Sequence, residues 1–116
     1  RSPLRRAIYL CEQNGVAIGA ESNTAMPPAF LMQQMAWREE LDEARRAPER
    51  LSMLASEVAR ERRDLIGRLR QAIDTDADFP GAAELTRQLM FVERFNAELH
   101  QLSGEAHPGA QAAAEN

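Results

Sequence analysis

Lysine is absent from this sequence, and cysteine and aromatic residues are scarce. All 14 basic residues are arginine, which we interpret as a coding bias because arginines also occupy ordinary solvent positions. The single cysteine, Cys11, excludes an internal disulfide and favours a reducing compartment, so we expect a cytoplasmic protein. No apolar run reaches the roughly 18 residues that a membrane span needs, so no membrane association is expected. The chain does not begin with Met, so we expect it to be part of a longer protein.

The residues that are present favour a helical globular domain. Hydrophobic residues make up 44% and charged residues 28% of the 116 positions, which is typical of a folded domain and not of a disordered chain. Ala, Leu, Glu, Arg and Gln dominate, whereas β-branched residues are sparse, and this balance favours helices over strands. The net charge of −4 argues against nucleic acid as a partner.

Four helices are predicted from apolar residues at helical spacing and from the residues that begin and end helices. Ser2 can cap the first helix and Asn14-Gly15 can end it, while Pro28 and Pro48 suit the first positions of the second and third. The predicted ranges are residues 2–14, 28–46, 48–73 and 80–102. The side chains that we expect to form the core are Phe30, Trp37, Leu41, Leu54, Val58, Leu65, Leu69, Leu89, Val92 and Phe95.

Short connections between the last three helices predict that neighbouring helices are antiparallel. The fold class is therefore all-α, an antiparallel three-helix bundle preceded by a short N-terminal helix and a linker. Because the linker is rich in Gly, Ser, Asn and Thr, we expect the first helix to pack loosely on the bundle or elsewhere. The predicted units are an N-terminal helix over residues 1–15, a linker over 16–27, the bundle over 28–103 and a flexible tail over 104–116.

The helix predicted over residues 28–46 carries a second face in addition to its core stripe. Leu31, Met32 and Met35 form the apolar part of this face, and Glu39 and Glu43 continue it as an acidic part. An exposed apolar patch with a charged rim is typical of a surface that binds another protein. A homodimer seam, or a misjudged core arc, is the alternative explanation.

Phe91 is expected to border this patch. On the last helix it lies about 90° from the centre of the core stripe. We therefore expect Leu31, Met35 and Phe91 to be more exposed than apolar side chains ordinarily are, and their replacement by alanine to cost the bundle little stability.

Residues that could carry catalysis or bind a metal are few and scattered. His100 and His107 belong to no metal-ligand spacing, and Cys11 lies on an apolar stripe without a base placed beside it. The arginines of residues 60–70 alternate with acidic residues, which is typical of a solvated helix face. The sequence therefore predicts no catalytic residue, no metal site and no cofactor.

Three blocks of residues resemble the HscB-type co-chaperones of iron–sulfur cluster assembly. The blocks are Ser2-Pro3-Leu4-Arg5-Arg6-Ala7 with Tyr9-Leu10, Phe30-Leu31-Met32 through Arg38-Glu39-Glu40-Leu41-Asp42-Glu43, and Gln88-Leu89-Met90-Phe91-Val92-Glu93-Arg94-Phe95. They occur in the family's order and spacing over residues 1–102. The middle block is specific to the family, and the others are ordinary helical sequence.

The resemblance implies a J domain that engages the DnaK-type chaperone HscA, and a C-terminal bundle that binds the scaffold protein IscU for cluster transfer. It implies that the scaffold-binding face consists of Leu31, Met32, Met35, Glu39, Glu43 and Phe91. Ala36 stands where the family often has a further acidic residue, and Met35 replaces a leucine of similar volume.

The chain lacks the His-Pro-Asp signature of a J domain, and its residues 1–14 resemble the final helix of that domain. This chain alone is therefore not expected to stimulate ATP hydrolysis by the chaperone. The expected function is that of a non-enzymatic adaptor. A small helical enzyme of the chorismate mutase kind, suggested by residues 63–74, and a helical dimerisation module are the alternatives.

Overall fold

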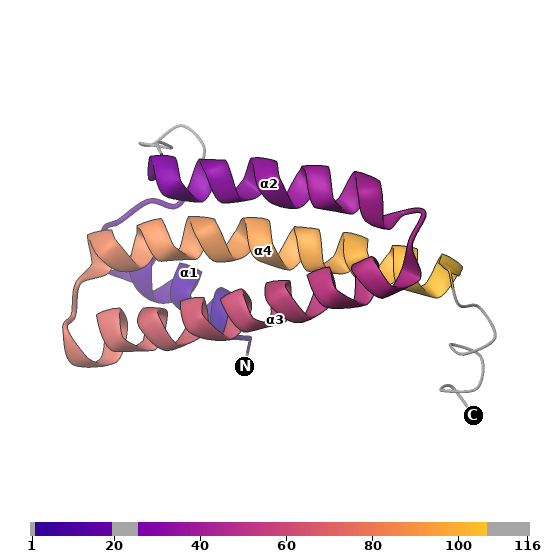
Figure 1. Cartoon of the computed structure of the whole chain (residues 1–116). Coiled ribbons are helices and arrows are strands. Elements are labelled where there is room, and N and C mark those ends of the chain that lie inside the picture. The colour runs from indigo at the N-terminus through magenta and orange to yellow at the C-terminus, as the bar shows by residue number, and fades with distance from the viewer. Residues whose placement is uncertain (1, 20–25, 107–116) are drawn as a thin grey trace, which may run out of the picture.

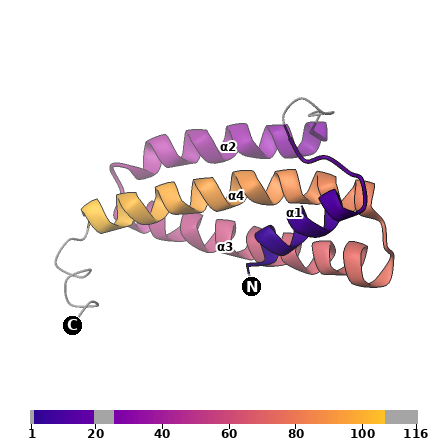
Figure 2. The same cartoon turned by 180° about the vertical axis from the view of Figure 1, so that it is seen from behind.

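The computed structural model describes residues 2–19 and 26–106, and the described residues form helices joined by short connections. Three long helices lie side by side, with α4 between α2 and α3 in the view of Figure 1, and successive helices of the bundle run in opposite directions. Figure 2, from behind, shows α1 crossing the bundle near the end where α3 ends and α4 begins. The elements are α1 (Pro3–Gln13), α2 (Pro28–Ala44), α3 (Pro48–Arg70), the π-helical turn η1 (Gln71–Thr75) and α4 (Phe79–Ala106).

The all-α prediction is confirmed, and the helix ends follow from local chemistry. The Ser2 hydroxyl accepts a hydrogen bond from the Arg5 backbone N–H at 3.3 Å, and prolines occupy the first positions of α1, α2 and α3. A proline fits there because a backbone N–H in the first turn has no acceptor within the helix, so its absence costs no hydrogen bond. Asp78 caps α4 by accepting the Gly81 backbone N–H at 3.0 Å.

Two helix ends differ from the prediction. The third helix was expected to continue to residue 73, but its last residues widen into η1, where the Asp76 N–H donates to the Gln71 carbonyl at 3.0 Å. This wider turn brings the consecutive residues Ala72 and Ile73 into the core together. The last helix continues to Ala106, so residues 104–106 of the predicted tail belong to α4. The remainder of the predicted tail, residues 107–116, lies outside the described residues.

Aromatic side chains fill the space between α2 and α4. Trp37 of α2 stacks on Phe95 of α4 with ring centroids 5.4 Å apart, and both rings are buried. The indole N–H of Trp37 donates to a carboxylate oxygen of Glu57 on α3 at 2.9 Å, so one side chain connects three helices. All ten side chains that the periodicity assigned to the core are buried, from Phe30 to Phe95.

The expectation that the first helix packs loosely is wrong. Ala7 and Cys11 are buried where α1 crosses α4, and the Cys11 thiol lies 3.7 Å from the Phe79 carbonyl oxygen, to which it donates. An ion pair of 2.6 Å between Arg6 and Asp74 joins α1 to η1. Small residues on the α1 stripe allow the two helices to approach closely, and Ile18 after α1 is buried as well.

Candidate partner-binding face

The candidate docking face is the set of side chains that sequence analysis assigned to partner binding: Leu31, Met32, Met35, Glu39, Glu43 and Phe91. Its apolar members on α2 are exposed, at 45% for Leu31, 70% for Met32 and 66% for Met35. Only two other large hydrophobic side chains among the described residues are as exposed, Tyr9 and Met53. Three of the five exposed large hydrophobic side chains in the described part of the chain therefore lie close together near the start of α2, as expected of a protein-binding patch.

Helical geometry explains why these side chains point away from the core. The buried side of α2 is formed by Phe30, Trp37, Leu41 and Ala44. At about 100° per residue, Leu31 falls on the flank of α2 that also carries Arg38, and Met35 and Met32 fall further round, toward the side opposite the buried one. Arg38 marks the α4 side, because its guanidinium bonds Glu98 at 3.0 Å and lies 5.2 Å from the centre of the Phe95 ring.

Phe91 differs from the other apolar members, and the expectation that it is similarly exposed is wrong. It is partly buried and packs against the core. Its ring meets Phe30 edge-on with centroids 5.7 Å apart, stacks on Phe95 at 5.7 Å, and lies 6.3 Å from the Trp37 ring. The wheel angle of Phe91 on α4 could not show that α2 places two aromatic rings beside it. Phe91 is therefore both a core residue and a border of the docking face.

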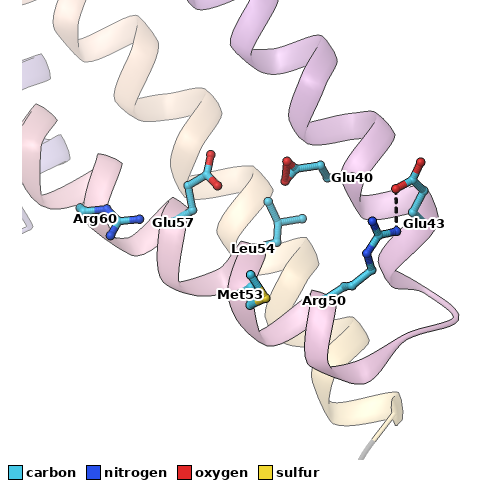
Figure 3. Close-up of a pocket in the computed structure, with 7 residues that line it drawn as sticks. All are labelled: Glu40, Glu43, Arg50, Met53, Leu54, Glu57 and Arg60. Carbon is cyan, nitrogen blue, oxygen red and sulfur yellow. Dashed lines mark hydrogen bonds and ion pairs between the residues drawn. The ribbon is translucent and has the colours of Figure 1, made fainter.

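The acidic members lie toward the C-terminal half of α2. Glu39 is exposed on the outer side. Glu43 faces α3 and pairs with Arg50 at 2.7 Å, with both side chains about 60% exposed. Figure 3 shows this ion pair reaching across the groove between the two helices. Ion pairs this exposed contribute little to stability, so the Glu43 carboxylate can exchange Arg50 for a cation of a partner.

The groove that the Glu43–Arg50 pair spans was not predicted from the sequence. The groove has a volume of about 320 Å³ and lies between α2 and α3. Met53 lies on its α3 wall and is 72% exposed. The sequence did contain a signal for Met53, because it falls outside the α3 core stripe of Leu51, Leu54 and Val58. The full lining is Glu40, Glu43, Arg50, Met53, Leu54, Glu57 and Arg60.

The residues considered for chemistry are not brought together. Within residues 2–19 and 26–106, no group of three or more His, Cys, Asp or Glu side chains is arranged to hold a metal ion. Burial raises the pKa of the Cys11 thiol, opposed by its hydrogen bond with Thr86 and by the charge of Arg87. A thiol with a raised pKa is a poor nucleophile. His100 is exposed on α4, and His107 lies outside the described residues.

Several arginines of α3 form ion pairs, and the grooves that pairs of them line, Arg50 with Arg60 and Arg63 with Arg68, are lined by carboxylates as well. Arg62 pairs with Glu93 of α4 at 3.1 Å, and Arg68 pairs with Asp64 one turn earlier at 3.7 Å. An enzyme that binds a dicarboxylate would need several unpaired arginines converging on one cavity. The arrangement therefore favours the solvated-face interpretation over the chorismate mutase one. No helix of the described part of the chain combines the length and apolarity needed to cross a membrane.

Comparison with known proteins identifies the family to which the three-helix bundle belongs. Residues 26–100 match the family described as the HSCB C-terminal oligomerisation domain. Proteins named co-chaperone protein HscB homolog from Burkholderia mallei (strain SAVP1) and Burkholderia pseudomallei (strain 668) are 52% identical over 101 residues, covering 85% of this chain and 57% of each relative. The homolog of that name from Bordetella pertussis is 50% identical over 99 residues, covering 85% of this chain and 58% of the relative.

These relatives are named as co-chaperones, and this chain spans a little over half of their length. The matched family region contains α2, α3 and nearly all of α4, and thus every residue of the candidate docking face. The chain belongs to the HscB co-chaperone family, and its three-helix bundle is the C-terminal domain of that family.

Proposed function

We propose that this chain is a non-enzymatic adaptor whose docking face binds an IscU-type iron–sulfur scaffold protein. In the longer protein, a J domain preceding the bundle would bring the bound scaffold to the DnaK-type chaperone HscA for cluster transfer in the cytoplasm. The observation that supports this most directly is the cluster of Leu31, Met32 and Met35, which stay exposed on a helix whose other side is fully buried. Covering such side chains is worth about 1.5–3 kcal/mol each when the burial is complete.

The apolar and acidic parts of the face would have different roles in docking. Leu31 and Met35 would supply affinity, because they lose water on contact with the partner. Glu39 and Glu43 would orient the scaffold and speed its approach, since exposed charges act on encounter more than on final affinity. Phe91 would act at the border of the contact and would also hold α2 in place through its aromatic neighbours.

Titration calorimetry with the IscU-type scaffold of the same organism tests the proposal. A Leu31→Ala/Met35→Ala variant should bind at least about 30-fold more weakly, because hot-spot losses of about 2 kcal/mol or more are common. Met53→Ala is the matched control, since Met53 lies on a different helix and is more exposed than either Leu31 or Met35. Unchanged binding by the double variant, or an equal loss in the control, would exclude this face as the docking site.

The proposal also predicts what the chain does to the chaperone. Without a His-Pro-Asp sequence, the 116-residue chain should leave the steady-state ATPase rate of HscA unchanged while it still binds the scaffold. A rate increase caused by this chain alone would contradict the adaptor role. The measurement needs the full-length co-chaperone as a positive control for an active chaperone preparation.

Self-association is a second candidate role, because the matched family is described as an oligomerisation domain. The exposed side chains of α2 could pair with those of a second copy instead of a scaffold. Sedimentation equilibrium over a wide concentration range distinguishes the two roles. A dimer that Leu31→Ala/Met35→Ala abolishes would identify the docking face as a homodimer seam. A monomer at all concentrations would exclude self-association and favour a different protein as the partner of this face.

A further inference from the structure

The docking face carries two of the three most exposed methionines among the described residues. Met32 and Met35 are 70% and 66% exposed on α2, and the third exposed methionine is Met53, at 72%, on α3. The remaining methionines, Met26 and Met90, are partly buried against the core.

The one thiol of the chain does not compete for an oxidant. Cys11 is fully buried under α4 and donates to the Phe79 carbonyl oxygen. A thioether needs no deprotonation to react, whereas a cysteine reacts as the thiolate. The exposed methionines are therefore the sulfur groups that a dissolved oxidant meets first, while the core that includes Cys11 stays intact.

We propose that Met32 and Met35 form a peroxide-sensitive modification site that weakens the docking face when oxidised. This proposal rests on the proposed docking function, and it adds a regulation of the same surface. The co-reactant is a hydroperoxide such as hydrogen peroxide. Its terminal oxygen bonds to the methionine sulfur as the O–O bond breaks, the sulfur loses two electrons, and the peroxide leaves as water or an alcohol.

The consequence for docking follows from the polarity of the product. A sulfoxide is polar and accepts hydrogen bonds, whereas the thioether that it replaces is an apolar contact. Covering a sulfoxide without giving it a hydrogen-bond donor is unfavourable, so the oxidised face should lose affinity for an apolar partner surface. The side chains of Met32 and Met35 project away from the buried side of α2, so the fold should tolerate their oxidation.

Met53 provides an internal reference for this proposal. It lies on the α3 wall of the groove in Figure 3, with the same chemistry and slightly greater exposure, but outside the docking face. Peroxide should oxidise Met53 as readily as Met32 and Met35. A bound scaffold should protect Met32 and Met35 from peroxide and leave Met53 reactive.

The experiment treats the 116-residue chain with hydrogen peroxide, quantifies each sulfoxide by peptide mass spectrometry, and measures scaffold affinity by calorimetry. Oxidation of both residues should raise the Kd at least tenfold, which corresponds to about 1.4 kcal/mol. The melting temperature should change little, and the two methionine sulfoxide reductases, one for each epimer, should restore affinity. Whatever its Kd before treatment, Met32→Leu/Met35→Leu should show no further rise in Kd after peroxide, whereas Met53→Leu should remain sensitive.

The possible failures are distinguishable. If the untreated chain does not bind the scaffold, the docking proposal itself is wrong. If the untreated chain binds and the fully oxidised chain binds equally well, docking stands and the modification proposal is overturned. Persistent sensitivity of Met32→Leu/Met35→Leu, or resistance conferred by Met53→Leu, would overturn the assignment of the site to these two residues.

Discussion

Replacing Phe91 with alanine should destabilise the fold, whereas replacing Leu31 and Met35 together should have a small effect. The sequence predicts that all three can be replaced with little loss of stability. This expectation remains for the exposed Leu31 and Met35 but not for Phe91, because Phe91 contacts three other aromatic rings. The change removes a partly buried ring from between α2 and α4, and the exposed leucine and methionine leave no comparable cavity behind.

The magnitude can be worked from the contacts. A fully buried Phe→Ala change costs about 3–5 kcal/mol, and aromatic pairs add about 0.5–1.5 kcal/mol beyond area. Since Phe91 is only partly buried, we expect a loss of about 2–3 kcal/mol in the free energy of unfolding. For a 116-residue chain this corresponds to roughly 8–12 °C in melting temperature. Exposed substitutions such as Leu31→Ala and Met35→Ala are typically within about 0.5 kcal/mol each.

Thermal melting followed by circular dichroism, together with urea unfolding followed by Trp37 fluorescence, measures both variants on one scale. Trp37 is the only tryptophan and stacks near Phe91, so its emission reports on the same cluster. Phe91→Leu is the control, since it keeps most of the volume and should recover most of the stability. A melting temperature for Phe91→Ala equal to that of the wild type would refute the assignment of Phe91 to the core.

Three further predictions concern contacts away from the docking face. Glu57→Ala removes the acceptor of the Trp37 indole N–H and should lower the free energy of unfolding by about 1 kcal/mol in urea titrations. Burial, and then the charge of Asp64, raise the pKa of Glu61 in the folded protein, so the charged carboxylate opposes folding at neutral pH. The Glu61→Gln variant should therefore have a higher melting temperature at neutral pH. This difference should vanish in acid, where the wild-type carboxyl is protonated in both the folded and the unfolded state. Arg6→Ala breaks only an exposed ion pair and should shift the melting temperature by a few degrees or less.

The helices and the core were predictable because they depend on local periodicity. Phe30, Trp37 and Leu41 recur at helical spacing, and a face of that kind has to be buried whatever it packs against. Prolines at positions 28 and 48 marked helix starts for a reason that is independent of tertiary structure. The exposure of Leu31, Met32 and Met35 followed from the same wheel, because one face of α2 was already committed to the core.

The contacts between distant segments could not be predicted in this way. The composition of residues 15–27 indicates a linker, but it contains no information on whether Ala7 and Cys11 find a surface on α4. The ring cluster around Phe91 forms only because α2 and α4 lie close together at this point. The position of a residue around its own helix gives no information on the distance to a neighbouring helix. The π-helical turn that includes Ala72 is likewise a compromise between backbone hydrogen bonding and core packing.

The place of Phe91 links the stability of the bundle to the presentation of the docking face. No side chain caps the N-terminus of α2, where Leu31 and Met32 lie, so this end is positioned by packing. Phe91 packs against Phe30 at this end and against the Trp37 ring two turns further on. A docking surface is effective only when its side chains are held in place before the partner arrives, because ordering them on binding lowers the affinity. Phe91→Ala should therefore weaken scaffold binding even if the scaffold never contacts the ring, and Phe91→Leu, which restores the packing, separates this positioning role from direct contact.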